Sequence, residues 1–195
     1  MQTLADINLD LAEFEKEPFP HFSCVMVLSN ELEKTLFTWF QETDAWSLTE
    51  MDFYTQFEFS LFDVELPERL KTLISEEIIN VVKHKFLHLF DVEHLELVGV
   101  TAHKLIDGHK IGVHNDYIEN EETHRMVLQI NPEWNEENGG YLMIFSSNDP
   151  EDVVQLVQPL NNTAFGFEIS SKSYHAVSTV RNYSRYTLVY TFRSN

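Results

Sequence analysis

The second half of the chain is a succession of short runs rich in β-branched and aromatic residues, with no helical pattern between them. From His94 onward, turn-forming residues break these runs at close spacing. Many short strands at such spacing are typical of a β-sandwich, a barrel or a jelly roll. The eight runs are ELVGVTAHKLI, KIGVH, HRMVLQI, GYLMIF, VVQLV, TAFGFEI, YHAVSTV and RYTLVYTF. We therefore expect an antiparallel sheet that folds back on itself.

The first 92 residues have a different pattern, in which apolar residues recur at helical spacing. One helix is expected to begin at Asn30, with the Asn30 side chain as its cap and Glu33 completing a capping box. A second helix is expected to begin near Pro67, a residue suited to a first helical turn, and to end at about Phe90. Both helices would pack on the outside of the sheet.

Two further segments complete this part of the chain. In residues 52–62, four apolar residues of one parity are interrupted by polar residues. These four are Phe53, Phe57, Phe59 and Leu61. Such a pattern predicts a strand with one buried face. Residues 1–20 are acidic and end in prolines, so we expect an irregular lead-in there.

The length of the chain limits the number of domains. A chain of 195 residues can bury one sizeable core and is too short for two ordinary domains. Only six glycines and six prolines, without a biased tract, leave little room for a linker. A single cysteine, Cys24, excludes an internal disulfide framework and a CxxC zinc site. We predict one α+β domain, residues 1–195, that consists mainly of β-structure.

The charge of the chain restricts its partners. Thirteen Lys and Arg against 32 Asp and Glu give a formal net charge of -19. Such a field repels phosphate backbones, so we expect no nucleic-acid partner. It attracts cations, including amine- or guanidine-bearing molecules, although solubility alone is a sufficient reason for it. The first residues do not resemble a secretory leader and no apolar run approaches a membrane span, so we expect a cytoplasmic protein without a membrane partner.

Histidine and carboxylate residues indicate a metal site in the β-rich half. His114 and Asp116 are two positions apart, and on a strand such positions project to the same face. One further histidine would complete the two-histidine, one-carboxylate set associated with non-haem Fe(II) oxygenases. His175, in SYHAVSTV, can supply it from another strand. Arg185, in the following run, could hold a dicarboxylate by a two-pronged contact.

Each of these residues has an ordinary alternative when it is taken singly. A His-x-Asp pair is often a turn, His175 could be a buried hydrogen-bonded histidine, and Arg185 could form a surface ion pair. Their common order within a series of short strands favours one shared site. A second pair, His84 and His88, has the spacing of zinc ligands on a helix, but Lys85 stands where the motif has glutamate. Partial burial is the expected explanation of that pair.

Four segments within residues 95–193 follow one another in a recognisable order. They are GHKIGVHND, LQINPEWNEENGGYLMIF, VVQLVQPLNNTAFGF and YHAVSTVRNYSRYTLVYTF. Together they resemble the prolyl 4-hydroxylase-like branch of the Fe(II)/2-oxoglutarate-dependent dioxygenases. The Gly139-Gly140 turn and the arginine ten residues after the second histidine also follow the family's order. The resemblance implies a double-stranded β-helix, or jelly roll, as the catalytic core over residues 93–195, with residues 1–92 as helical and strand support.

The resemblance also implies a site for Fe(II), 2-oxoglutarate and O2, with ascorbate as an optional reductant. The family's iron ligands fall on His114, Asp116 and His175, and its basic residue for the distal carboxylate of 2-oxoglutarate falls on Arg185. Thr187 has the same strand parity as Arg185 and could add a hydroxyl to that carboxylate. Related halogenases lack the carboxylate ligand, so the presence of Asp116 argues against halogenation.

Three further residues are candidates for binding. Many family members have a tyrosine that contacts 2-oxoglutarate at the position of Gln129, whose amide can still donate to a carboxylate. Arg125 shares parity with Gln129 and could hold a substrate carboxylate, with a surface ion pair as the alternative. His109 could line the mouth of the pocket or lie in a solvated turn. Residues 117–124, directly after the ligand pair, are a candidate lid.

The resemblance implies an oxidoreductase, and we expect a hydroxylase. It would hydroxylate an unactivated C–H bond of an amino acid or a peptidyl side chain, consuming O2 and releasing succinate and CO2. The substrate would be a small molecule or a peptide, and the acidic surface favours a cationic one. Desaturation or cyclisation in natural-product biosynthesis is an alternative within the family. Outside it, a cupin-like metal-binding isomerase or lyase and a non-catalytic sensor module stay open.

Overall fold

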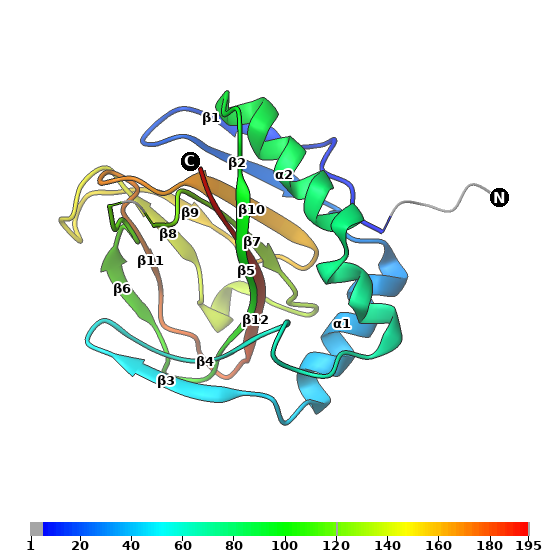
Figure 1. The fold of residues 1–195 in the computed structure, drawn as a ribbon. Helices are drawn as coiled ribbons and strands as arrows, with labels where there is room; N and C mark the ends of the chain where they lie inside the picture. Colours follow the sequence, from blue (N-terminus) through cyan, green and yellow to red (C-terminus); the bar gives the residue numbers. More distant parts are fainter. Residues whose placement is uncertain (1–5, 120, 195) are drawn as a thin grey trace.

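The structure is a computed structural model that describes residues 6–119 and 121–194. A strongly curled antiparallel sheet carries two α-helices on one side (Figure 1). The strands are β1 (Glu13–Glu15), β2 (His21–Val25), β3 (Ser47–Met51), β4 (Tyr54–Ser60), β5 (Glu96–Leu105), β6 (Ile111–His114), β7 (His124–Gln129), β8 (Leu142–Phe145), β9 (Val153–Val157), β10 (Thr163–Glu168), β11 (His175–Val177) and β12 (Arg185–Arg193). The helices are α1 (Asn30–Glu42) and α2 (Glu76–Phe90), with 3-10 segments η1 (Glu68–Ile74) and η2 (Glu136–Asn138).

The strands follow the order β1-β2-β10-β7-β12-β5-β4-β6-β11-β8-β9, and β3 is attached to β4. In Figure 1 the strands around β12 form one layer, and β6, β11, β8 and β9 form the other. β4 joins the two layers, because it pairs with β5 and also meets β6 where Tyr54 lies opposite Ile111. This is the expected jelly roll, and all eight strands predicted after His94 are present as β5 to β12.

The helix α1 is capped by a serine instead of the expected asparagine. The Ser29 hydroxyl accepts a hydrogen bond from the backbone N–H of Leu32, and Asn30 is already helical. The predicted capping box of Asn30 and Glu33 is therefore wrong, because the cap is Ser29, one residue earlier. Glu33 instead accepts a hydrogen bond from the side chain of Asn161. Serine and asparagine are similarly good caps, so the sequence alone could not choose between two adjacent candidates.

The second expected helix is interrupted at Ser75. The backbone of Ser75 is extended, with ψ of 152°, and its hydroxyl caps α2 by accepting from the N–H of Ile78. The prediction of one helix from Pro67 to Phe90 is thus corrected to η1 followed by α2. The apolar stripe did not indicate this break, because buried residues occur at helical spacing on both sides of it. They are Leu70 and Leu73 before Ser75, and Ile78, Val82 and Phe86 after it.

The lead-in over residues 1–20 is more regular than expected where the structure describes it. Ile7 and Leu9 are buried, and β1 pairs with β2. The expectation of irregular structure is therefore wrong for Glu13–Glu15, while its first five residues lie outside the described part of the chain. β2 pairs in turn with β10. Strands from the first 92 residues thus belong to the same sheet as the predicted jelly-roll core.

The strand β4 is covered on both faces, although one buried face was expected. Phe59 is buried in the core, whereas Gln56 is buried on the opposite face. Phe53, which was assigned to the core parity, lies in the turn before β4 and is 41% exposed. The second face is covered because the curled sheet folds over it, and it lines the cavity described below.

The main core lies between the helices and the outer face of the β12 layer. Leu36 and Phe40 of α1 and Phe86 of α2 are fully buried against this face, which presents Leu188 and Tyr190. Burial of each such side chain stabilises the fold by roughly 1.5–3 kcal/mol. On β12 the residues of even number therefore face the core, which leaves those of odd number for the inside of the curled sheet. No helix in the described ranges is long and apolar enough to cross a bilayer.

Candidate metal centre and its pocket

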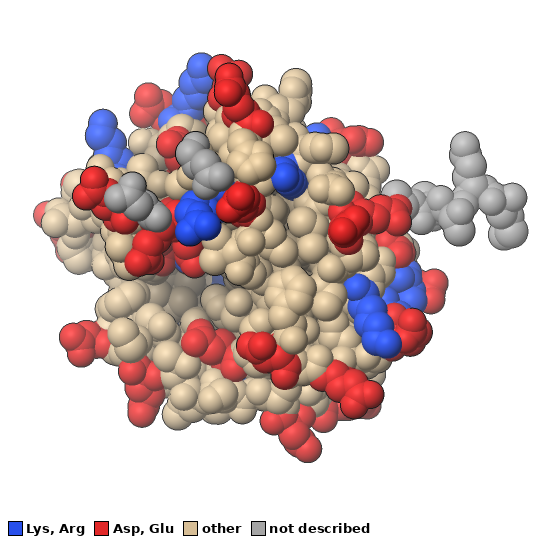
Figure 2. All heavy atoms as spheres, viewed as in Figure 1, with Lys and Arg blue, Asp and Glu red and all other residues tan. Residues whose placement is uncertain are grey.

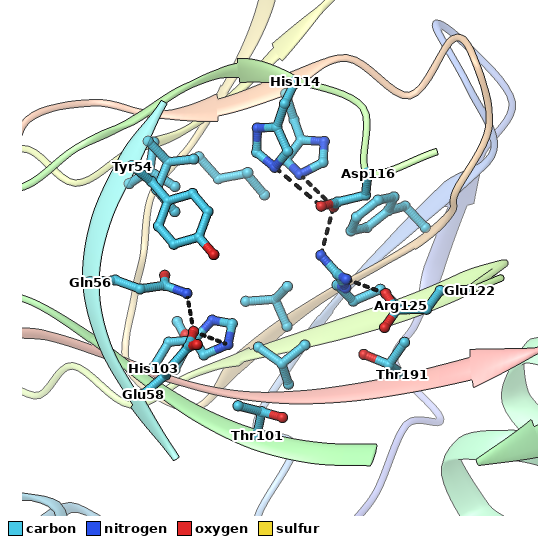
Figure 3. Close-up of a pocket in the computed structure, with 18 of the residues that line it drawn as sticks. Tyr54, Gln56, Glu58, Thr101, His103, His114, Asp116, Glu122, Arg125 and Thr191 are labelled. Carbon is cyan, nitrogen blue, oxygen red and sulfur yellow. Dashed lines mark hydrogen bonds and ion pairs between the residues drawn. The ribbon is translucent and has the colours of Figure 1, made fainter. Parts of the chain in front are cut away.

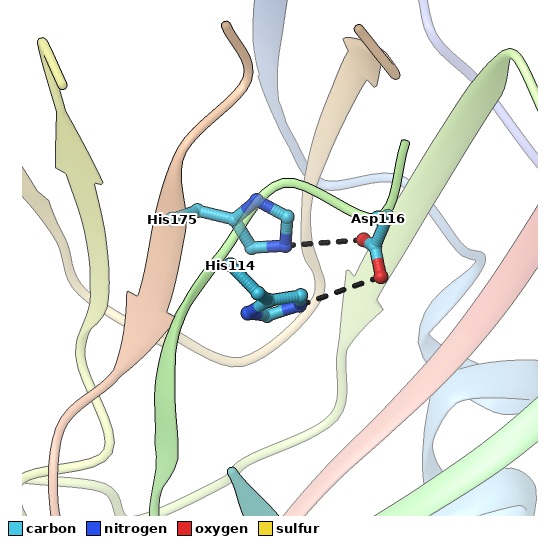
Figure 4. Close-up of side chains that lie close together, drawn as sticks. All are labelled: His114, Asp116 and His175. Carbon is cyan, nitrogen blue, oxygen red and sulfur yellow. Dashed lines mark ion pairs between the residues drawn. The ribbon is translucent and has the colours of Figure 1, made fainter. Parts of the chain in front are cut away.

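His114 and His175 lie opposite each other on neighbouring strands. They are paired directly in the register of β6 and β11, and their ring centroids are 4.2 Å apart. Asp116 lies beyond the end of β6, where its backbone adopts a left-handed conformation with φ of 58° that a short polar residue tolerates. The Nε2 atoms of His114 and His175 consequently lie 3.4 and 3.3 Å from the two carboxylate oxygens (Figure 4). Asp116 thus reaches the site through a turn and not, as expected, from a continuous strand.

The backbone fixes which ring nitrogen of each histidine faces the carboxylate. Nδ1 of His114 donates to the carbonyl oxygen of Gly112 at 2.9 Å, and Nδ1 of His175 donates to that of Ser173 at 2.8 Å. Since a carbonyl oxygen only accepts, the proton of each neutral ring lies on Nδ1 and Nε2 carries a lone pair. Two lone pairs and a carboxylate then face one another. This arrangement is repulsive unless a cation lies between them.

Burial and charge favour the protonation states that a metal needs. Burial lowers the pKa of His175, although the negative charge of Asp116 opposes the shift. Burial alone would raise the pKa of the Asp116 carboxyl, but the charge of Arg125 opposes it, and that pKa lies well below its usual range. One ligand atom from each of the three residues lies within 4.8 Å of the others. Two imidazoles and one carboxylate are suited to a divalent metal such as Fe(II).

Arg185 is a buried cation without a carboxylate partner among the described residues. It is 5% exposed, its side chain lines the same cavity, and its Nε has no hydrogen-bond partner. Burial lowers its pKa to about 10, so the guanidinium is still charged at neutral pH. An unpaired buried charge costs free energy unless an anion neutralises it. A carboxylate-bearing ligand such as 2-oxoglutarate would therefore fit this position.

Two structural features position Arg185. A Cβ atom on Gly140, whose φ is +69°, would come within 2.9 Å of the Arg185 Cδ. The buried Asn131 accepts from the backbone N–H of Tyr186 at 2.7 Å and donates to the carbonyl of Pro159 at 3.0 Å. The glycine turn and the asparagine of the sequence motif therefore support the start of β12, where the guanidinium originates.

Thr187 and Gln129 lie opposite each other in the register of β12 and β7, and both are almost fully buried. Thr187 lines the cavity together with Arg185. Gln129 does not line the cavity; its Oε1 is 3.4 Å from the donating amide of Asn131, and its Nε2 has no hydrogen-bond partner. Their predicted contacts with 2-oxoglutarate stay predictions, and the unused amide hydrogens of Gln129 are compatible with one.

Arg125 also lines the cavity, but it already has two carboxylate partners. Its Nη1 donates to Asp116 Oδ2 at 2.6 Å, and its Nη2 donates to Glu122. Burial lowers the pKa of Arg125, but these two carboxylates outweigh it and hold the pKa above its ordinary value. The contact with a substrate carboxylate stays a prediction. The alternative, an ion pair, is what the structure contains, and the pair lies inside the pocket instead of on the surface.

The cavity measures about 320 Å³ and has a second polar side that the sequence analysis did not identify. Tyr54, Gln56 and Glu58 point into it from β4, and Glu58 is paired in register with His103 of β5 (Figure 3). We call these four residues the β4 wall. The signal was present in the alternation of residues 52–62, because Tyr54, Gln56 and Glu58 share the parity opposite to the core phenylalanines.

The candidate ligand residues that line the cavity are His114, Asp116, His175, Arg185 and Thr187, and we call them the metal wall. His114 and Asp116 lie across the cavity from Gln56 and Glu58 (Figure 3), whereas Thr187 pairs with His103 in the register of β12 and β5. Figure 3 shows the hydroxyl of Tyr54 directed toward the space between the two walls. Figure 2 shows a hollow on the face drawn there, with mostly uncharged residues at its rim and more acidic than basic side chains near it. The cavity is therefore polar on two sides and open to solvent from a face with more acidic than basic side chains.

Two other predicted features are His109 and the segment 117–124. His109 stacks on Phe57 with ring centroids 5.8 Å apart and does not line the cavity in the described part of the chain. Of residues 117–124, Glu122 lines the cavity through its contact with Arg125. The pocket-mouth role of His109 and the lid role of residues 117–124 stay predictions.

The alternative histidine pair is not brought to a metal-binding geometry. His84 and His88 are both exposed on α2, so the expected partial burial of this pair is wrong. Over residues 6–119 and 121–194, the group of His, Cys, Asp and Glu side chains with ligand spacing is the one formed by His114, Asp116 and His175. The i, i+4 spacing of His84 and His88 therefore has no third ligand in the described structure.

One known family matches the part of the chain that contains this site. A model of the 2OG-Fe(II) oxygenase superfamily matches residues 100–193. The matched segment extends from within β5 to the end of β12, and it includes the three candidate metal ligands and Arg185. Among curated proteins, no sequence matches this chain.

Solved prolyl hydroxylases share the fold. A Pseudomonas putida prolyl-4-hydroxylase has a TM-score of 0.73 at 16% identity, over 90% of this chain and 92% of that one. A Trichoplax adhaerens prolyl hydroxylase, in complex with a hypoxia inducible factor oxygen degradation domain peptide fragment, has a TM-score of 0.74 at 12% identity, over 89% and 83%. A viral collagen prolyl hydroxylase from Paramecium Bursaria Chlorella virus-1, in its 2OG complex, has a TM-score of 0.64 at 12% identity, over 90% and 96%. At these identities the likeness concerns the fold alone.

Proposed function

Because the chain belongs to the 2OG-Fe(II) oxygenase superfamily, an oxidoreductase family that uses Fe(II), 2-oxoglutarate and O2, we propose that it hydroxylates a small molecule or a peptide. The bond attacked would be an unactivated C–H bond of an amino acid or a peptidyl side chain. A peptide substrate is supported by the Trichoplax relative, whose structure contains a peptide fragment.

One observation carries this proposal. The cavity contains a cluster of candidate metal-binding acceptor atoms and, in the same space, a buried guanidinium without a carboxylate partner among the described residues. The Nε2 lone pairs of His114 and His175 face the carboxylate of Asp116. In the same cavity the guanidinium of Arg185 is buried without a carboxylate among the described residues. A divalent metal and a dicarboxylate together would satisfy both groups.

When bound, Fe(II) and 2-oxoglutarate supply an oxidation in which O2 delivers one oxygen atom to the substrate and one to succinate, with release of CO2. The protein would contribute the geometry of the site. His114, Asp116 and His175 would hold the metal, and Arg185 with Thr187 would bind the distal carboxylate of 2-oxoglutarate. The cavity between the two walls would exclude bulk water and hold the target carbon.

The decisive test uses the intact chain under anaerobic conditions. Fe(II) and 2-oxoglutarate are added together, and a visible charge-transfer band of the chelate is expected, followed by succinate when O2 is admitted. Absence of the band in folded, iron-loaded protein would refute the proposal. A cupin-like isomerase or lyase would bind metal without consuming 2-oxoglutarate. Product mass separates hydroxylation, which adds one oxygen atom, from desaturation or cyclisation, which removes two hydrogens.

The assignment of Arg185 has its own test. Arg185→Ala removes a charged hydrogen-bonding group, so the dissociation constant of 2-oxoglutarate should rise about 10- to 100-fold while Fe(II) binding persists. Arg193→Ala is the matched control, because Arg193 lies at the exposed end of the same strand. Normal 2-oxoglutarate binding by Arg185→Ala would contradict the co-substrate assignment alone.

A further inference from the structure

The β4 wall contains hydrogen-bond acceptors that the proposed reaction does not use. We propose that Gln56 and Glu58 recognise the substrate, and that the group they bind is a cation with several N–H donors, such as the guanidinium or ammonium of a side chain. The inference rests on the proposed function, since it names the substrate class of that same cavity. It concerns the side of the cavity opposite the candidate metal ligands.

The register of the sheet places these two residues together. Gln56 and Glu58 are two positions apart on β4, so their side chains project to the same face. Both line the cavity, and in Figure 3 they lie across it from His114 and Asp116. A substrate between the walls would therefore present one end to the metal wall and the other to Gln56 and Glu58.

Gln56 has an acceptor without a partner. The side chain is 6% exposed, and its Oε1 has no hydrogen-bond partner in the structure. Its Nε2 donates to Glu58 Oε2 at 2.6 Å, which orients the amide and leaves Oε1 for another donor. A buried polar atom that stays unpaired costs free energy, so a ligand that donates to Oε1 would be favoured.

Glu58 is held in place by neutral groups. Thr49 donates to its Oε1 at 2.9 Å and Gln56 donates to its Oε2. Across residues 6–119 and 121–194, the ion-pair partner within reach of Glu58 is His103, at 3.9 Å. Burial, reinforced by the charges of Arg125 and Arg185, lowers the pKa of His103 to about 4 against the opposing effect of Glu58. His103 is therefore neutral near pH 7, and the negative charge of Glu58 is not cancelled by it.

The charges of the whole cavity lead to the same conclusion. Its lining contains three carboxylates, Glu58, Asp116 and Glu122, and two guanidiniums, Arg125 and Arg185. Bound Fe(II) and 2-oxoglutarate would cancel each other, as a dication and a dianion. One negative charge then remains, and Glu58 is the carboxylate that neither guanidinium contacts. A cationic substrate would neutralise it, whereas an anionic one would be repelled.

The shape of the acceptor pair favours a group with several donors. An acceptor amide oxygen and a carboxylate side by side can take two N–H bonds from one guanidinium, or from one ammonium. A hydroxyl or an aliphatic group would leave at least one of these acceptors unsatisfied. The surplus of acidic over basic side chains near the opening would also attract cations from solution.

The test measures ligand binding to the anaerobic Fe(II)–2-oxoglutarate holoprotein, with the chelate band as the signal. The probes are N-acetyl-arginine amide, N-acetyl-lysine amide and N-acetyl-citrulline amide, which has nearly the shape of the arginine probe without its charge. The cationic probes should perturb the band at concentrations about tenfold or more below the citrulline probe. Equal binding of the arginine and citrulline probes, or tighter binding of an acidic probe, would overturn the inference without any variant.

Variants locate the effect. Glu58→Gln should reduce the affinity for the cationic probes about tenfold or more and leave the chelate band unchanged. Glu50→Gln, on the exposed side of the adjoining β3, should leave both unchanged. If Glu58→Gln retains full preference for the arginine probe, Glu58 is not the recognition residue. A missing band in the wild-type protein would instead mark failure of the proposed function, so the two failures are distinguishable.

Discussion

The two walls of the cavity are held in place by different kinds of contact. In the metal wall the backbone positions the basic residues: the Nδ1 atoms of His114 and His175 donate to main-chain carbonyls, and Arg185 packs against Gly140, while Asp116 accepts from the side chain of Arg125. In the β4 wall, Glu58 is oriented by other side chains. Main-chain contacts persist when neighbouring side chains change, whereas side-chain contacts change with each substitution.

This difference matches two different roles, cofactor binding for the metal wall and substrate selection for the β4 wall. A wall fixed by the backbone suits chemistry that a whole family shares, which here is the binding of Fe(II) and 2-oxoglutarate. A wall fixed by side chains suits substrate selection, because one or two substitutions can alter its charge and hydrogen bonding. The following experiments test the comparison, from the largest expected effect to the smallest.

The largest effect is expected from His175→Ala. Loss of one of three metal ligands should reduce Fe(II) affinity by more than about 100-fold, beyond the range for loss of a residue that only supports a ligand. Isothermal titration with Fe(II) under anaerobic conditions measures this. His84→Ala, at an exposed position of α2, is the control and should bind Fe(II) normally. If His175→Ala still binds Fe(II) tightly, His175 is not a metal ligand, and the metal wall is wrongly assigned.

A smaller effect is expected from Arg125→Met. This variant removes the donor to Asp116 Oδ2, so Fe(II) affinity should fall about tenfold through misorientation of the carboxylate. Arg125→Lys should recover part of the loss, because it restores the charge without the forked geometry. Arg181→Met, at an exposed position, is the control. If Arg125→Met instead weakens only substrate binding, Arg125 belongs functionally with the β4 wall.

Gly140→Ala tests whether the backbone positions Arg185. A left-handed φ for alanine should cost about 1–2 kcal/mol of stability, and its Cβ should displace the guanidinium and weaken 2-oxoglutarate binding. Gly108→Ala separates the two effects, since Gly108 also has positive φ but a Cβ there meets nothing within 4 Å. Denaturant melts and 2-oxoglutarate titrations should show destabilisation in both variants and loss of affinity in Gly140→Ala alone. Equal 2-oxoglutarate affinity in Gly140→Ala and Gly108→Ala would show that the position of the Arg185 guanidinium does not depend on Gly140.

The smallest effect is expected from the protonation of His103, in the β4 wall, on the free energy of unfolding. The folded protein holds the pKa of His103 at about 4, chiefly by burial, whereas the unfolded chain titrates near its ordinary value. Acidification therefore protonates the unfolded state first, and the free energy of unfolding should fall as the pH drops from about 6.5 toward 4. Between pH 6.5 and 5 the contribution of His103 is about 1.6 kcal/mol, and His103→Gln should remove it.

Chemical denaturation at several pH values measures this contribution. His88→Gln, at an exposed position, should leave the pH dependence unchanged. A wild-type slope that persists in His103→Gln would show that other groups, such as the buried His124, are responsible for it.

The local pattern was sufficient for the strands and for choosing the candidate ligand residues that the structure brings together. Alternation and turn residues mark β5 to β12, and the His-x-Asp, His and Arg series marks the metal wall. Local competition between similar signals explains the errors. Ser29 and Asn30 are both good caps, and Ser75 interrupts an apolar stripe whose helical spacing continues on either side.

The sequence by itself determined which residues share a face, because strand parity is a property of the chain alone. Only the tertiary structure decided what each face meets. Tyr54, Gln56 and Glu58 were visibly on one side of a strand, but the curling of the sheet is what covers that side and places it across a cavity from Asp116. Arg125 likewise donates to Asp116 because the backbone after β6, with Asp116 in a left-handed conformation, brings this carboxylate toward β7. Contacts between distant segments depend on how the whole sheet closes, and no local pattern contains that information.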